Sequence, residues 1–144
     1  MVSKNFFDNH LGALIECVNF ASDEIMQIYN SESFDQEEKS DGSPLTIADK
    51  KSNEIILNSL EKISKDISII SEETFSEDLI KSLDQTYWLV DPLDGTKEFI
   101  NKTGEFTVNI AMINNKKVVF GIVGAPVTRK IWHGSVFEDV QSQN

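Results

Sequence analysis

The sequence predicts an α+β fold in which layered helices pack on a mostly antiparallel sheet. Three observations lead to this prediction. Helical periodicity fills the first part of the chain, two short apolar runs that each end in acids occupy the middle, and alternating residues in the last third indicate consecutive strands. With 144 residues the chain has the length of one domain with a real core.

Two helices are expected first. Apolar residues at near-helical spacing predict a long amphipathic helix over residues 5–29. After a polar loop, the run TIAD at residues 46–49 has the Ser/Thr-x-x-acid form of a helix start. The second helix is therefore expected to begin there, with Asp49 in its first turn, and to end near Ser64.

Short strands are expected in the middle of the chain and a meander after them. The apolar runs 67–70 and 87–90 read as strands, with a brief helix over residues 77–83 between them. Further on, alternation over residues 106–112, a return over 118–123 and a third run over 130–133 predict antiparallel strands. Residues 137–144 show no obvious closing element, and the far face of the hairpin has no partner left in the sequence.

Composition narrows the classes of function. A formal net charge of −11 argues against a nucleic acid polymer as partner, because phosphate backbones are bound by clustered Lys and Arg. Small phosphorylated substrates stay possible if metal ions supply positive charge locally. No apolar run approaches the ~20 residues that span a bilayer, so no transmembrane segment is expected and cytoplasm is the default location. Cys17 is the only cysteine, so no internal disulfide can form.

Acidic residues gather where the two central strands end. Carboxylates at the end of a buried strand repel each other and resist desolvation, so they call for a compensating cation. If the two strands are neighbours, the side chains of Glu72, Asp91 and Asp94 can converge. Oxygen-only ligands favour Mg²⁺, and zinc is the weaker choice because neither histidine lies nearby in sequence.

The residues around Asp94 fit the same interpretation. Pro92 fixes the chain so that the Leu93 carbonyl can join the metal ligands, and Gly95 leaves room for a ligand beside the backbone. A short helix starting near Thr96 would offer free N–H groups to a phosphate, and the Thr96 hydroxyl can orient a water. Two cations ~3.5–4 Å apart with such a water constitute a metal-assisted phosphoester hydrolase.

The motifs in this order resemble a known superfamily. Asp49, then SEE at residues 71–73, then DPLDGT at residues 91–96 resemble the lithium-sensitive, magnesium-dependent phosphomonoesterases, which include inositol monophosphatase and fructose-1,6-bisphosphatase. KEF at residues 97–99, GEFTVN at 104–109 and DGSPLTIAD at 41–49 are more similar to its 3'(2'),5'-bisphosphate nucleotidase branch. The resemblance implies two or more Mg²⁺ ions, inhibition by Li⁺ and hydrolysis of the 3'-phosphate of adenosine 3',5'-bisphosphate, in sulfur assimilation.

The resemblance also implies a role for each site residue. Mg²⁺ would be bound by Glu72, Asp91, Asp94 and the Leu93 carbonyl. Thr96, oriented by Asp49 and helped by Glu72, would position the attacking water. The backbone N–H groups of Gly95 and Thr96 would receive the phosphate, with Glu72 and Asp94 also beside the substrate. Glu73 is expected to support the ligands without touching the metal.

One departure from the family pattern affects the whole chain. The family continues into a second α/β domain that carries a Trp-Asp motif, whereas Trp88 and Trp132 are not followed by Asp. Residues 1–144 are therefore expected to be the N-terminal metal-binding domain, a fragment or truncated product without its substrate domain and with weak or no turnover. Two alternatives stay open: an inositol monophosphatase-like enzyme, and a noncatalytic half-domain that binds or forms a homodimer.

Overall fold

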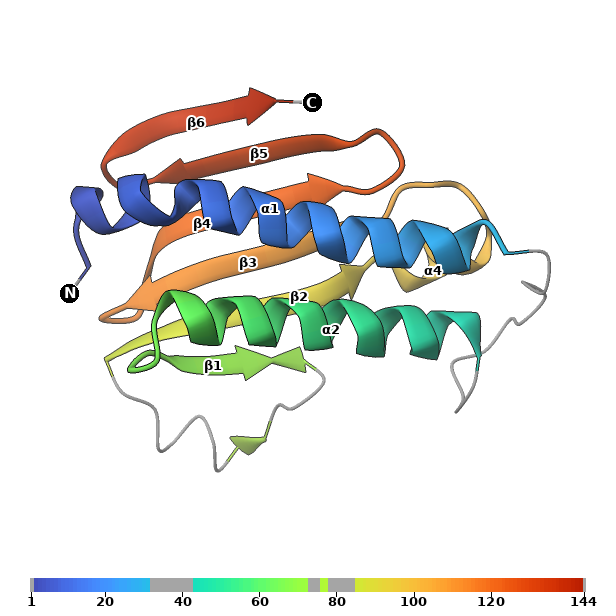
Figure 1. Ribbon diagram of the computed structural model, residues 1–144, viewed down its shortest axis with the longest axis horizontal. Helices are drawn as coiled ribbons and strands as arrows, with labels where there is room; N and C mark the ends of the chain where they lie inside the picture. Colours follow the sequence, from blue (N-terminus) through green and yellow to red (C-terminus); the bar gives the residue numbers. More distant parts are fainter. Residues whose placement is uncertain (1, 32–42, 73–75, 78–84, 144) are drawn as a thin grey trace.

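A computed structural model describes residues 2–31, 43–72, 76–77 and 85–143. In these ranges two long helices lie side by side on one face of a six-stranded sheet (Figure 1). The elements are α1 Lys4–Tyr29, α2 Pro44–Ile63, β1 Ser68–Ser71, β2 Thr86–Asp94, α4 Thr96–Ile100, β3 Thr107–Asn114, β4 Lys117–Ala125, β5 Lys130–Ser135 and β6 Glu138–Gln143.

The sheet follows the order of the chain, β1-β2-β3-β4-β5-β6. β1 pairs with β2 in parallel, and every later pair is antiparallel. The predicted α+β class, with helices layered on a mostly antiparallel sheet, is therefore confirmed. No helix in the described part of the chain is long and apolar enough to cross a membrane.

The start of α2 differs from the prediction. Its N-cap is Ser43, whose Oγ accepts a hydrogen bond of 3.1 Å from the Thr46 N–H, and Pro44 occupies the first helical turn. Proline suits this position because its φ is already helical and it has no N–H to leave unpaired. The TIAD run is thus inside the helix, and Asp49 lies in the second turn, not the first.

The extent of β2 and the presence of β6 also differ from the prediction. β2 continues through Asp94 instead of ending at Val90, with a register shift against β3 between Asp91 and Asp94. Residues 138–143, where no element was expected, form β6 along β5. Backbone pairing makes this strand, and its mostly exposed polar side chains carry no alternating signal. The helix expected over residues 77–83 lies almost wholly outside the described residues.

The core lies between the two helices and the sheet. Trp88, Phe99 and Phe106 are its largest fully buried side chains. α1 packs so closely on β4 that a Cβ at Gly124 would lie 2.3 Å from Val18 Cγ1, which explains this glycine. A Cβ at Gly121, in the same strand, would meet nothing within 4 Å, so packing does not require glycine there.

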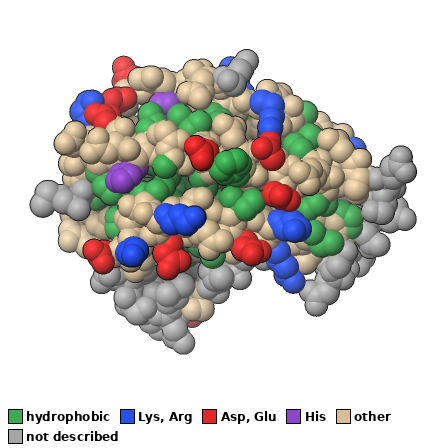
Figure 2. Space-filling view, in the orientation of Figure 1, with side chains coloured by type: hydrophobic (Ala, Val, Ile, Leu, Met, Phe, Trp, Pro, Cys, Tyr) green, Lys and Arg blue, Asp and Glu red, His purple; other side chains and the backbone are tan. Residues whose placement is uncertain are grey.

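The outer surface of the helices is mixed. Figure 2 shows acidic and basic side chains interspersed with hydrophobic ones on this face. Phe20, on α1, is 52% exposed, whereas its neighbour Ala21 is fully buried. Such alternation is what an amphipathic helix on a sheet presents to solvent.

A candidate metal-binding carboxylate site

The ends of β1 and β2 bring two acidic segments together. The parallel register places Ser71 beside Val90, so Glu72 and Asp91 follow from adjacent positions at the same end of the sheet. This is the neighbourhood that the sequence predicted for their carboxylates. Glu73, the next residue, lies outside the described ranges.

Asp91 is the electrostatic centre of the site. Its carboxylate is half-buried, and its Oδ1 is shielded from solvent without a hydrogen-bond partner among the described residues. Burial, and then the negative charges of Glu72, Asp94 and Asp49, raise the pKa of Asp91 from 3.8 to about 6, while a hydrogen bond from the Leu93 N–H opposes the shift. Carboxylates from three separate parts of the chain therefore act on Asp91.

α2 carries the buried Asp49 and forms hydrogen bonds to residues of β1 and β2. Asp49 is only 2% exposed on the helix face that packs toward the sheet. The Ser52 hydroxyl, also on α2, donates a 2.7 Å hydrogen bond to the Pro92 carbonyl, and the Ser71 hydroxyl bonds to Asn53. These contacts hold α2 against the segment that carries Asp91 and Asp94. Nothing in the sequence pattern marked Ser52 for this role.

The turn after β2 depends on a glycine. Gly95 has a left-handed φ of +100°, and a Cβ there would lie 2.9 Å from the Glu105 carbonyl oxygen and 3.0 Å from Phe106 Cα. Glycine is thus required by backbone conformation and by packing, and no local sequence pattern reveals the contact with residues 105 and 106. Leu93, just before it, buries its side chain in the core.

α4 begins directly after this turn. Its first hydrogen bond runs from the Phe99 N–H to the Gly95 carbonyl at 2.9 Å. Gly95 is the N-cap residue and has no side chain that could accept a hydrogen bond from the N–H groups of the first turn. The exposed Thr96 is the first residue of the helix, as predicted. Thr96 follows two residues after Asp94, which is also exposed.

The donor chemistry fits a hard cation, although the ligands are not assembled. Within the described ranges, no three His, Cys, Asp or Glu side chains are grouped so that they could hold a metal ion. The shielded Asp91 oxygen without a hydrogen bond and the oxygen-only set of Glu72, Asp91 and Asp94 match the preference of Mg²⁺.

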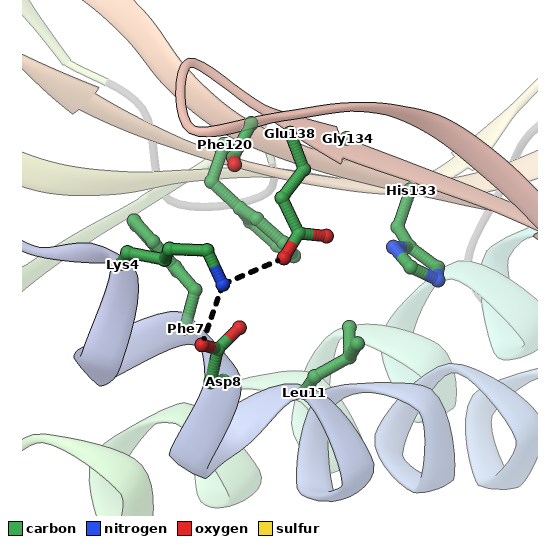
Figure 3. A pocket seen from close by; sticks show the side chains of 9 residues that line it. Lys4, Phe7, Asp8, Leu11, Phe120, His133, Gly134 and Glu138 are labelled. Atoms are coloured by element: carbon green, nitrogen blue, oxygen red, sulfur yellow. Dashed lines mark hydrogen bonds and ion pairs between the residues drawn. The ribbon is translucent and has the colours of Figure 1, made fainter.

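A small, partly open pocket of about 20 Å³ lies elsewhere, between the start of α1 and β4 to β6 (Figure 3). There the Lys4 ammonium lies 2.9 Å from Asp8 and 3.1 Å from Glu138, joining the helix to the edge strand. These exposed ion pairs contribute little energy. The pocket is at the end of α1 opposite α4, so we assign it no part in the carboxylate site.

Known proteins are similar to this chain in sequence. The inositol monophosphatase family profile matches residues 8–143. The 3'(2'),5'-bisphosphate nucleotidase CysQ of Salmonella typhimurium (strain LT2) is 45% identical over 116 residues, which cover 80% of this chain and 47% of that protein. The CysQ of Escherichia coli (strain K12) is 46% identical over 108 residues, 74% of this chain and 44% of that protein.

Solved structures agree with the sequence matches. The crystal structure of CysQ from Bacteroides thetaiotaomicron matches 96% of this chain and 50% of its own, with a TM-score of 0.85 and 36% identity. An inositol monophosphatase from Zymomonas mobilis shares the fold with a TM-score of 0.79 at 22% identity, over 99% of this chain and 52% of its own. This chain spans about half the length of the curated relatives it matches. It belongs to the inositol monophosphatase family.

Proposed function

We propose that this chain is the metal-binding part of a Mg²⁺-dependent phosphomonoesterase that removes the 3'-phosphate of adenosine 3',5'-bisphosphate and yields AMP. The observation that carries the proposal is the parallel pairing of β1 with β2, which places Glu72 and Asp91 at adjacent strand ends, together with the shielded Asp91 Oδ1 that has no hydrogen-bond partner among the described residues. Similarity to nucleotidases of the CysQ type supports the choice of substrate. Because the chain spans about half of those relatives, the activity is proposed for the whole protein.

The side chains at the site have separate roles in this proposal. Glu72, Asp91, Asp94 and the Leu93 carbonyl would hold Mg²⁺. When bound, Mg²⁺ lowers the pKa of a ligated water and offsets negative charge on the leaving oxygen. These acids are concentrated where β1 and β2 end, so the ion would be held against a rigid sheet.

Water and phosphate would be oriented by α4 and α2. Thr96, assisted by the buried Asp49 and by Glu72, would hold the attacking water, and the Gly95 and Thr96 N–H groups would receive phosphate oxygens. The water oxygen forms a bond to phosphorus, the bond from phosphorus to the ribose 3'-oxygen breaks, and a proton passes to that oxygen. Residues 1–144 would serve as the N-terminal domain, with substrate selection in the part of the relatives that this chain does not match.

The test is phosphate release with Mg²⁺ titration. Adenosine 3',5'-bisphosphate should lose phosphate only when Mg²⁺ is present, and Asp91→Asn should abolish the release. Asp139→Asn, the same change on the exposed edge strand β6, should leave it intact. Equal Mg²⁺-dependent rates for Asp91→Asn and the unchanged protein would refute the metal assignment.

Two comparisons separate the alternatives. A higher rate on an inositol monophosphate than on the nucleotide would favour an inositol monophosphatase-like enzyme, and inhibition by Li⁺ would fit either branch. The second candidate is a noncatalytic half-domain. Calorimetric Mg²⁺ binding without phosphate release, lost in Asp91→Asn, would support that candidate.

A further inference from the structure

α4 ends in a conformation that normally favours glycine. Lys102 has a left-handed φ of +62°, the Thr103 N–H bonds to the Glu98 carbonyl at 3.1 Å, and the Lys102 N–H bonds to the Phe99 carbonyl at 3.3 Å. This pair of bonds is the Schellman motif, with Lys102 at the position where glycine is usual. A residue other than glycine with a left-handed backbone is strained, so the contacts of Lys102 should explain why it is found here.

The Lys102 side chain reaches the end of another helix. Its ammonium donates a hydrogen bond to the carbonyl of Tyr29, the last residue of α1, and lies 4.1 Å from the centroid of the Tyr29 ring. The last carbonyls of a helix have no intrahelical partner and carry partial negative charge. Lys102 therefore both caps α1 and makes a cation–π contact.

The same tyrosine is a second attachment point for α4. Its ring centroid lies 5.3 Å from that of Phe99, in α4, and 4.9 Å from that of Phe106, just before β3. Phe99 and Phe106 also meet edge to face at 5.2 Å. α4 is thus joined to the end of α1 by an apolar contact through Phe99 and a polar contact through Lys102.

We propose that Lys102 is a positioning residue that fixes α4 against the C-terminal end of α1. α4 starts at Thr96, directly after Asp94 and Gly95, so a shift of this short helix would move all three groups. The consequence for metal binding depends on the proposed function, whereas the positioning itself does not. Lys102 touches neither substrate nor metal in this proposal.

Hydrogen exchange tests the positioning directly. Lys102→Met removes the charge but keeps the left-handed backbone and the apolar stem, and Lys102→Arg keeps the charge as well. In Lys102→Met, protection of the Phe99 and Asn101 amides should fall roughly fivefold, equivalent to ~1 kcal/mol, whereas Lys102→Arg should retain it. The matched control is Lys116→Met, since Lys116 is also an exposed lysine with a positive φ, of 66°, but lies in the β3–β4 turn.

The control should leave protection in α4 unchanged. The free energy of global unfolding should fall by no more than the same amount in Lys102→Met, because full unfolding breaks the same contact, and it should change little in Lys102→Arg and Lys116→Met. Equal protection of the Phe99 and Asn101 amides in Lys102→Met and the unchanged protein would overturn the proposal. So would a loss of the same size in Lys102→Arg.

Calorimetric titration with Mg²⁺ supplies a second test, in which the direction of the change in Mg²⁺ affinity is informative. Removing a positive charge would by itself strengthen the binding of a cation. Weaker Mg²⁺ binding by Lys102→Met, by several-fold, therefore supports positioning, and stronger binding contradicts it. If the unchanged protein binds no Mg²⁺, the proposed function fails, and the exchange measurement alone decides the role of Lys102.

Discussion

Asp91 is a half-buried acid whose pKa is raised by the fold. Its pKa rises from 3.8 to about 6 through burial and neighbouring carboxylates, so between these pH values the folded protein holds a proton that the unfolded chain releases. The stability that this group contributes is thus fully present below pH 3.8 and is lost as pH rises through about 6. In metal-free protein, Asp91→Asn should remove this pH dependence and be more stable than the unchanged chain at pH 7.

Urea denaturation at a series of pH values measures this effect. Asp139→Asn, an exposed site, should keep the pH dependence of the unchanged protein. A parallel pH profile for Asp91→Asn and the unchanged chain would show that the Asp91 pKa is not raised by folding.

Gly95 gives a second prediction at the scale of one residue. Gly95→Ala places a Cβ in a left-handed conformation, 2.9 Å from the Glu105 carbonyl oxygen, and should destabilise the protein by ~1–3 kcal/mol. Gly12→Ala is the matched control, because Gly12 lies inside α1 with nothing within 4 Å of the new Cβ. There alanine should stabilise by up to ~1 kcal/mol. A lower urea midpoint for Gly95→Ala and a higher one for Gly12→Ala, each relative to the unchanged chain, would confirm the two predictions. A Gly95→Ala midpoint at or above that of the unchanged chain would contradict the prediction for Gly95.

At the scale of elements, α2 holds the site through Ser52. Ser52→Ala removes the hydroxyl that bonds to the Pro92 carbonyl at 2.7 Å and leaves that acceptor without this partner. Loss of a buried partner should destabilise the protein by ~1–3 kcal/mol and weaken Mg²⁺ binding. Denaturant unfolding and calorimetry measure the two effects. A variant that unfolds at the original midpoint would show that this bond adds nothing to the stability of the site.

The elements differ in how well the sequence predicts them. α1 was predicted closely because its apolar periodicity persists over many turns. β6 was missed because an exposed edge strand needs only backbone pairing. The start of α2 was misplaced because both Ser43 and Thr46 are good capping residues, and only the fold shows which one bonds.

The candidate site was also predictable only in part. Two strands that both end in acids predicted the approach of Glu72 to Asp91, and the parallel register confirms that neighbourhood. The contacts of Ser52 and Lys102 join positions 40 and 73 residues apart in sequence, and no local pattern reveals such pairs. The individual roles of the site residues stay predictions.

At the scale of the whole molecule, the net charge of −11 and the proposed metal site make separate predictions about stability. Any salt screens the mutual repulsion of the acids, whereas a ligand that binds only the folded state adds stability by mass action. Mg²⁺ at 100 times its dissociation constant should add ~2.7 kcal/mol and raise the unfolding temperature by roughly 5–12 °C for a chain of this size.

The control for that measurement is NaCl at the same ionic strength. Scanning calorimetry should show a larger rise in unfolding temperature with Mg²⁺ than with NaCl, and Asp91→Asn should retain only the rise that NaCl produces. Equal rises in Mg²⁺ and NaCl for the unchanged chain would mean that screening accounts for the whole effect. Residues 1–144 would then lack a specific Mg²⁺ site, and the proposed function of this chain as the metal-binding part would fail.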